Sequence, residues 1–137
     1  MENNNLIKSI KEGEGYRDKV YKCTEGFDTI GYGFAVKDLV LEEDICDMIL
    51  ERKLEKLKAR VDDRFDFLKY QPEEVKDVIY EMCYQMGVSG VSKFKKALSN
   101  LADNNYNKAS VEMLDSLWAK QTPNRALKLS NIIKSFE

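Results

Sequence analysis

The chain has no histidine, two prolines and three cysteines among its 137 residues. Three cysteines are too few, and odd in number, for a disulfide framework. Without histidine, their wide spacing also argues against a zinc site. We therefore expect Cys23, Cys46 and Cys83 to be free thiols, and we expect no metal and no cofactor.

Long apolar runs are also missing. No run approaches the roughly 18 apolar residues that a membrane-spanning helix needs, and the segment from Met1 to Asn5 is too polar to begin a secretory signal. We expect a protein that is made and folded in a cytoplasm, without stable insertion into a membrane.

Neither sign of charge dominates, since 22 basic residues face 24 acidic ones and the net charge is −2. The chain has no global field to attract nucleic acid, wall polymer or acidic lipid, and we expect no nucleic-acid partner. The hydrophobic share of 43% is enough to bury a core. The length then favours one domain, 1–137.

The first third of the chain predicts a short helix followed by a small β region. Apolar residues at 6, 7 and 10 form one face of a helix that should end near Gly13, with Glu14 at its C-terminal edge. From Val20 to Tyr32 the residues are mostly β-branched or aromatic, interrupted by the turn signal Thr24-Glu25-Gly26. Cys23 should lie beside this turn, and Thr29 on the returning strand.

The rest of the chain predicts helices. A long, fairly exposed helix is expected over 42–62, and another from Pro72 to Gly87, because proline fits the first turn of a helix. Three shorter helices follow, over 91–101, 111–118 and 126–136. We expect a mostly α, α+β protein with a small lobe at about 1–40, a connecting helix at about 41–64 and a helical lobe at about 65–137. A cleft between the lobes is plausible.

Several separated motifs resemble one family in the same order along the chain. They are Glu14-Gly15, the Tyr21–Gly26 turn, Thr29-Ile30-Gly31-Tyr32-Gly33, Gln85-Met86-Gly87 and Gln121-Thr122-Pro123-Asn124-Arg125-Ala126. The sequence is similar to the phage-type lysozymes over nearly its whole length, although it lacks a helical segment that the longest members insert after the β region. The resemblance implies a lysozyme-like, two-lobed fold. It also implies an endolysin that hydrolyses the β-1,4 bond between N-acetylmuramic acid and N-acetylglucosamine in bacterial peptidoglycan and so lyses its host.

The resemblance also assigns roles to individual residues. Glycoside hydrolysis needs an acid that protonates the leaving oxygen and a second group that directs water or attacks the sugar. Glu14 matches the acid, and Arg125 matches the residue that pairs with this acid in the family. Thr29 matches a hydroxyl that helps to hold the attacking water.

Cys23 stands where many members of the family carry aspartate. A free thiol has a pKa of about 8.5, so only a few per cent is ionised at neutral pH. The site must lower this pKa, or work with the neutral thiol. The alternative is that Cys23 is a small hydrophobic residue in a chain that has lost activity. Asp18 and Asp28 are weaker candidates for the second group, since Asp28 should point away from the face that carries Thr29.

Three further residues match positions that face the substrate in the family. Tyr84, Gln85 and Thr122 are expected to contact sugar hydroxyls or the peptide stem. Two positions depart from the family's usual pattern: Phe34 replaces a common histidine, and Glu81 replaces an asparagine. The second change alters the charge of the expected cleft.

The expected partner is bacterial peptidoglycan, bound by a monomer. Without a signal segment, a separate membrane-permeabilising protein would have to release the enzyme to the periplasm. Two other classes stay open: a catalytically inactive peptidoglycan-binding module, and a plain helical interaction protein. The second would explain the amphipathic helices but not the motifs.

Overall fold

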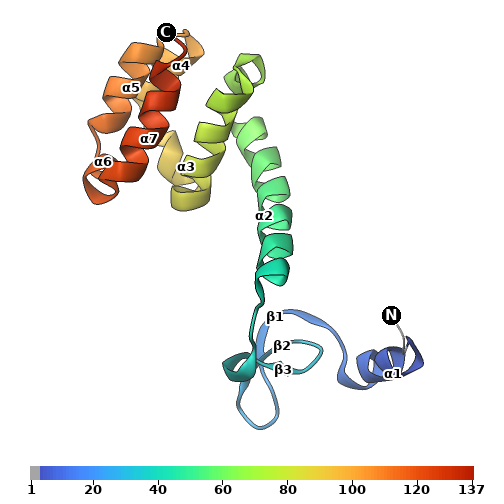
Figure 1. Ribbon diagram of the computed structural model, residues 1–137. Helices are drawn as coiled ribbons and strands as arrows, with labels where there is room; N and C mark the ends of the chain where they lie inside the picture. Colours follow the sequence, from blue (N-terminus) through green and yellow to red (C-terminus); the bar gives the residue numbers. More distant parts are fainter. Residues whose placement is uncertain (1–3) are drawn as a thin grey trace. The chain divides into compact units, whose positions relative to one another are not determined.

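The structure is a computed structural model that describes residues 4–137. Met1, Glu2 and Asn3, which belong to the polar start considered above, lie outside the described residues. The chain forms two compact units, an N-terminal unit of Met1–Cys46 and a C-terminal unit of Asp47–Glu137. Figure 1 shows the elements of both units, and each unit is described by itself.

The N-terminal unit contains helix α1 (Asn4–Glu14) and a three-stranded antiparallel sheet. The strands β1 (Arg17–Lys22), β2 (Asp28–Gly31) and β3 (Phe34–Ala35) follow one another in space as they do in sequence. Thr29, at the centre of the sheet, lies opposite Tyr21 of β1 and Ala35 of β3. The predicted helix and hairpin are therefore confirmed, and β3 is an additional strand that the sequence analysis did not predict.

Helix α2 (Glu43–Arg64) begins with two acidic residues, which suit the positive end of the helix dipole. Its second half buries Leu57 and Val61. Near its end, the Asp62 carboxylate accepts a hydrogen bond of 2.5 Å from the Tyr80 hydroxyl. The long predicted helix is confirmed, and its C-terminal half belongs to the core of the C-terminal unit.

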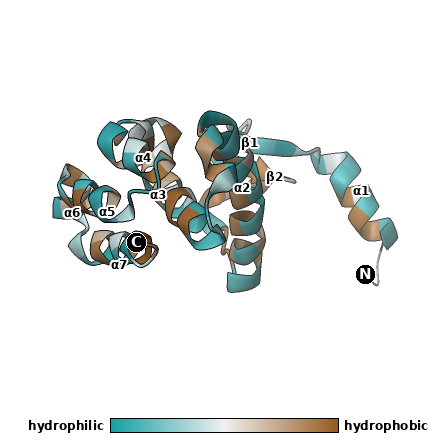
Figure 2. Cartoon of the chain, turned by 90° about the horizontal axis from the view of Figure 1, so that it is seen from above, coloured by the Kyte–Doolittle hydropathy of each residue, from teal (hydrophilic) through white to brown (hydrophobic). Residues whose placement is uncertain are grey.

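The C-terminal unit also contains the short 3-10 helix η2 (Asp66–Tyr70) and the α-helices α3 (Glu73–Ser92), α4 (Lys95–Ala102), α5 (Tyr106–Leu114), α6 (Leu117–Gln121) and α7 (Pro123–Lys134). Helices α5 and α7 lie side by side (Figure 1). In Figure 2, apolar and polar residues alternate along these helices, as amphipathic helices require. All the buried apolar side chains of residues 4–137 lie in this unit, between Leu57 and Ile133.

The buried side-chain amide of Gln71 fixes the segment between α2 and α3 by hydrogen bonds to residues of the C-terminal unit. The Gln71 side chain donates to the Leu101 carbonyl oxygen at 2.9 Å and to Asn104 Oδ1 at 2.8 Å, and it accepts from the Tyr106 hydroxyl at 2.8 Å. This side chain is 7% exposed. Its hydrogen bonds offset the cost of removing an amide from water.

Two predicted helices are wrong in their extent. The helix expected over 91–101 is interrupted at Lys93 and Phe94, where Phe94 leaves helical geometry (φ −77°, ψ 55°). The helix expected over 111–118 is two helices, because Ser116 leaves helical geometry and caps α6 by accepting the Ala119 N–H at 3.1 Å. The end predicted at Gly87 is confirmed as a kink, with φ at +81°, after which helical turns resume up to Ser92.

Two cysteines differ in burial. Both Cys46 and Cys83 fall on the apolar faces of the helices expected from the sequence, and this position predicts burial for each. Cys83 is buried as predicted, but Cys46 is exposed, so the prediction is wrong for Cys46. Cys46 lies near the start of α2, well before the part of the helix that enters the core at Leu57. None of the described helices combines the length and the apolar character that crossing a membrane requires.

Candidate active site

Glu14 is the last residue of α1 and is exposed. The helix ends there because Gly15 adopts a left-handed conformation (φ +74°), which glycine takes without steric cost. The Gly15 N–H still donates to the Lys11 carbonyl oxygen at 2.9 Å and closes the last turn. The Glu14 carboxylate lies directly against Gly33, in the turn between β2 and β3.

Cys23 opens the turn between β1 and β2. Its N–H donates to the Phe27 carbonyl oxygen at 2.9 Å, and its own carbonyl oxygen accepts from the Gly26 N–H at 2.9 Å. These bonds fold the turn around the sulfur. The N–H of Phe27, followed by that of Glu25, stabilises the thiolate and lowers the pKa of Cys23. The Thr29 hydroxyl lowers this pKa further, while partial desolvation and the Glu25 carboxylate oppose the shift.

Thr29 is 5% exposed, the only buried side chain among the described residues of the N-terminal unit. Its hydroxyl donates to the Phe27 carbonyl oxygen at 3.0 Å. Because a hydroxyl has one proton, it cannot donate to the Cys23 sulfur at the same moment. The backbone N–H groups of the turn, which have no such conflict, are the main reason for the lowered pKa of Cys23.

The two alternative carboxylates, Asp18 and Asp28, are both exposed. Asp28 is exposed and lies 2.7 Å from the Lys22 ammonium, whereas its neighbour Thr29 is buried. The two side chains therefore point to opposite faces of β2, as predicted. Asp18 is exposed on β1. The structure brings Thr29, and neither aspartate, into contact with the Cys23 thiol.

Arg125 lies in the first turn of α7, and its Nε donates to Glu81 Oε2 of α3 at 2.8 Å. The side chains are 39% and 37% exposed, so the ion pair is partly shielded from water. A cation is disfavoured near the N-terminus of a helix, and Glu81 offsets this cost. Sequence reasoning missed this pair. The expected pairing of Arg125 with Glu14 joins the two units and stays a prediction.

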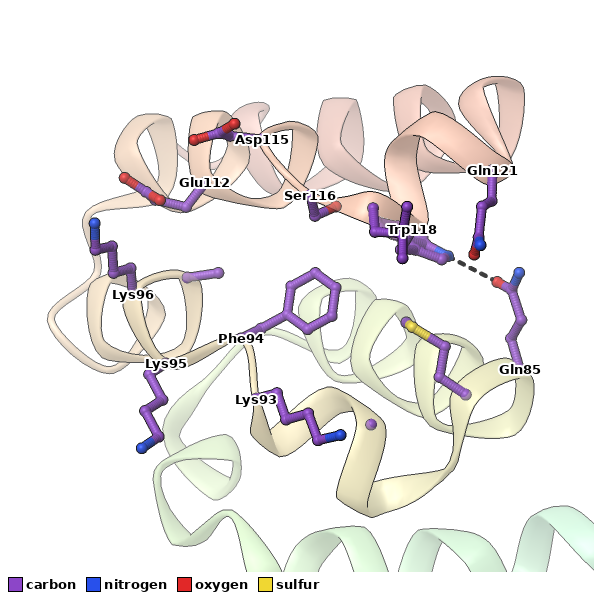
Figure 3. Close-up of a pocket in the computed structure, with 14 residues that line it drawn as sticks. Gln85, Lys93, Phe94, Lys95, Lys96, Glu112, Asp115, Ser116, Trp118 and Gln121 are labelled. Carbon is purple, nitrogen blue, oxygen red and sulfur yellow. Dashed lines mark hydrogen bonds between the residues drawn. The ribbon is translucent and has the colours of Figure 1, made fainter.

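Gln85 and Thr122 both contact Trp118. The Trp118 indole Nε1–H donates to Gln85 Oε1 at 2.9 Å, which Figure 3 shows as a dashed line. The Thr122 hydroxyl donates to the Trp118 carbonyl oxygen at 3.0 Å. Tyr84, the third predicted substrate contact, is exposed on α3. Sequence reasoning did not single out Trp118, although a buried indole N–H nearly always finds a partner.

A hollow of about 660 Å³ opens beside Gln85 within the C-terminal unit. The Phe94 and Trp118 rings line it and meet edge to face, with centroids 5.9 Å apart (Figure 3). Charged side chains also line it: Lys93, Lys95, Lys96, Glu112 and Asp115 (Figure 3). The hollow therefore combines two aromatic rings with lysines, which can bind carboxylates, and acidic side chains, which can bind amines. Among residues 4–137, no group of three or more potential metal ligands lies together.

Three known proteins are similar to nearly the whole of this chain. Probable T4-type lysozyme 1 of Dictyostelium discoideum is 28% identical over an alignment 163 positions long, which covers 95% of this chain and 96% of that protein. Probable T4-type lysozyme 2 of the same organism is 28% identical over 159, covering 95% and 94%. The pre-baseplate central spike protein Gp5 of Enterobacteria phage T4 is 27% identical over 163, covering 96% of this chain but only 28% of that protein.

The family model described as phage lysozyme matches residues 11–131. This range contains Glu14, Cys23, Thr29 and Arg125, and it spans both units. The match covers far more than half of the chain, and the helical fold with one small antiparallel sheet agrees with it. The chain belongs to the phage lysozyme family.

Proposed function

We propose that this protein is a lysozyme that hydrolyses the β-1,4 bond between N-acetylmuramic acid and N-acetylglucosamine in bacterial peptidoglycan. Glu14 is the general acid, and Cys23 is the second group of the reaction. The observation that carries the proposal is the placement of groups around Cys23: the turn after β1 brings the N–H groups of Phe27 and Glu25 and the Thr29 hydroxyl to its sulfur, and this lowers the pKa of the thiol.

Glu14 and Cys23 have separate roles in the proposed reaction. Glu14 gives its proton to the leaving glycosidic oxygen as the bond to the anomeric carbon breaks. The Cys23 thiolate takes a proton from the attacking water, or else attacks the anomeric carbon itself before water releases the sugar. Thr29, whose hydroxyl adjoins the thiol, helps to hold the water. Both routes need the thiolate, so the lowered pKa serves each of them.

Arg125 is proposed to steady the Glu14 carboxylate. Its Nε is engaged by Glu81, which leaves the two Nη groups of the guanidinium as the donors for a second carboxylate. Glu81 also balances the charge of Arg125, so the site gains an oriented donor without a full added positive charge.

A lysis assay on outer-membrane-permeabilised Gram-negative cells tests the proposal. The wild type is expected to clear the suspension, while Glu14→Gln loses at least about 100-fold in rate, because general acid catalysis contributes about 10² to 10⁴. Cys23→Asp should retain activity, and Cys23→Ser and the alkylated protein should not. Mass analysis of the digested wall should find new reducing ends at N-acetylmuramic acid.

The outcomes separate the alternatives. A wild type that binds purified peptidoglycan without cleaving it would make the chain an inactive binding module. If Cys23→Ser and the alkylated protein kept the full rate while Glu14→Gln was dead, Cys23 would have no part in the chemistry. Circular dichroism of each variant must match the wild type, so that losses are not losses of fold.

Substrate contacts are proposed for Tyr84, Gln85 and Thr122, with the peptide stem in the hollow beside Gln85. A stem peptide carries carboxylates and amines, which match the lysines and acids around the Phe94 and Trp118 rings. Glycan strands stripped of their stems by an amidase provide the test. Glu112→Gln should raise the KM several-fold on intact peptidoglycan and leave it unchanged on stripped strands; equal effects on both would place the stem elsewhere.

The biological role follows from the resemblance alone. A lysozyme of this kind would lyse a bacterial host from the periplasm, after a separate protein has permeabilised the inner membrane. This role stays a prediction.

A further inference from the structure

The Glu14 side chain occupies the space in which a side chain at position 33 would lie. A Cβ added to Gly33 would lie 2.5 Å from Glu14 Oε2, 3.1 Å from its Cδ and 3.7 Å from its Cγ, and these are the three nearest heavy atoms. A distance of 2.5 Å is far inside van der Waals contact. The Glu14 carboxylate thus lies where any other residue at position 33 would put its side chain.

The other glycines of the N-terminal unit show that this contact is specific. A Cβ on Gly31 would meet the Phe34 ring at 2.7 Å, and a Cβ on Gly15 would meet nothing within 4 Å. Gly15 and Gly33 have nearly the same positive φ, at +74° and +76°. They therefore share the strain that a substitution brings, and they differ in what the new side chain would touch.

We infer that Gly33 is a positioning residue for the catalytic acid. Its missing side chain provides the place in which the Glu14 carboxylate rests, against the turn between β2 and β3. The inference depends on the proposed role of Glu14 as the acid. It adds a second element to the site, since the acid's position is then fixed by the sheet as well as by the end of α1.

A substitution at Gly33 would displace the acid rather than the backbone. The atom that a Cβ meets first is the end of a flexible side chain, and rotating a carboxylate away costs much less than moving a strand. The displaced group would be the proton donor itself. A shift of about 1 Å in a reacting group costs about 100-fold in rate.

The experiment compares Gly33→Ala with Gly15→Ala in the full chain. Both should lower the melting temperature by similar amounts, because both place alanine at a left-handed position. Gly33→Ala should lower kcat at least about tenfold below that of Gly15→Ala, with little change in KM, because an acid acts in the transition state. If Gly33→Ala keeps the wild-type kcat, Gly33 has no positioning role.

Two further measurements apply if Gly33→Ala or Gly15→Ala unfolds the protein. Asparagine tolerates left-handed geometry better than alanine, so Gly33→Asn and Gly15→Asn repeat the comparison with less strain. The double variant with Glu14→Asp tests the contact itself, because a carboxylate one methylene shorter avoids the added methyl group. In the Glu14→Asp background, Gly33→Ala should cost no more than about threefold; additive losses would show that the two residues act independently.

The proposed function and this inference can fail separately. An active Glu14→Gln variant would remove the acid and with it the inference. A dead Glu14→Gln variant, together with a Gly33→Ala variant as active as the wild type, would leave the acid in place and remove only the role of Gly33.

Discussion

Cys23 has a side chain that would be mostly protonated at neutral pH in an unfolded chain. Its behaviour changes because the turn that follows it directs the N–H groups of Phe27 and Glu25 at the sulfur. The sequence predicted the turn and the difficulty with the pKa, but not the direction of the shift. That direction depends on where backbone N–H groups point, which no residue type encodes.

Alkylation of Cys23 should report its lowered pKa. Iodoacetamide reacts with the thiolate, so a lower pKa moves the rise in reaction rate to lower pH. The midpoint for Cys23 is expected at lower pH in the folded protein than in urea, as followed by site-resolved mass spectrometry. Cys83 should stay unreactive in the folded protein, because burial raises its pKa to about 11 and shields it from the reagent.

A pair of substitutions at Thr29 provides the control. Thr29→Ser keeps the hydroxyl that helps to lower the pKa of Cys23, and Thr29→Val removes it. The valine variant should move the midpoint of alkylation part of the way back to higher pH, because the backbone N–H groups remain. Identical midpoints for Cys23 in the folded and unfolded protein would contradict the shift altogether.

At the scale of elements, helical periodicity predicted where apolar faces lie better than where helices end. The apolar residues 111, 114, 117 and 118 fit one helix, yet the chain breaks at Asp115 and Ser116. The sequence does contain a signal for the break, since serine is a preferred helix cap. The break near Phe94 has no such signal, and packing of this ring against Trp118 accompanies it.

In the candidate site, contacts between residues close in sequence could be predicted, and contacts between residues far apart in sequence could not. The hairpin could be predicted because its turn and strand residues are adjacent in sequence, and in the structure the Thr29 hydroxyl lies beside the Cys23 thiol. The Glu81 to Arg125 ion pair spans 44 positions, and the Trp118 to Gln85 hydrogen bond spans 33. Such contacts depend on how α3 packs against α6 and α7, which periodicity does not determine.

At the scale of the whole molecule, the buried core is unevenly divided. Every buried apolar side chain of residues 4–137 lies in the C-terminal unit, and Thr29 is the only buried side chain described in the N-terminal unit. Burial of apolar surface is the main driving force of folding. The C-terminal unit therefore holds the interactions that an independent fold requires.

Expressing the two parts separately tests this division. Residues 43–137, which keep the whole of α2, should be helical and unfold cooperatively on heating. Residues 1–42 should lack a cooperative transition, because one short helix and a small sheet without a core are marginal in water. Circular dichroism and hydrogen exchange measure both. As a control, Val78→Asp in the longer fragment should abolish its transition, since this valine is 1% exposed. An unfolded wild-type fragment 43–137 would mean that the N-terminal residues supply contacts on which the helical core depends.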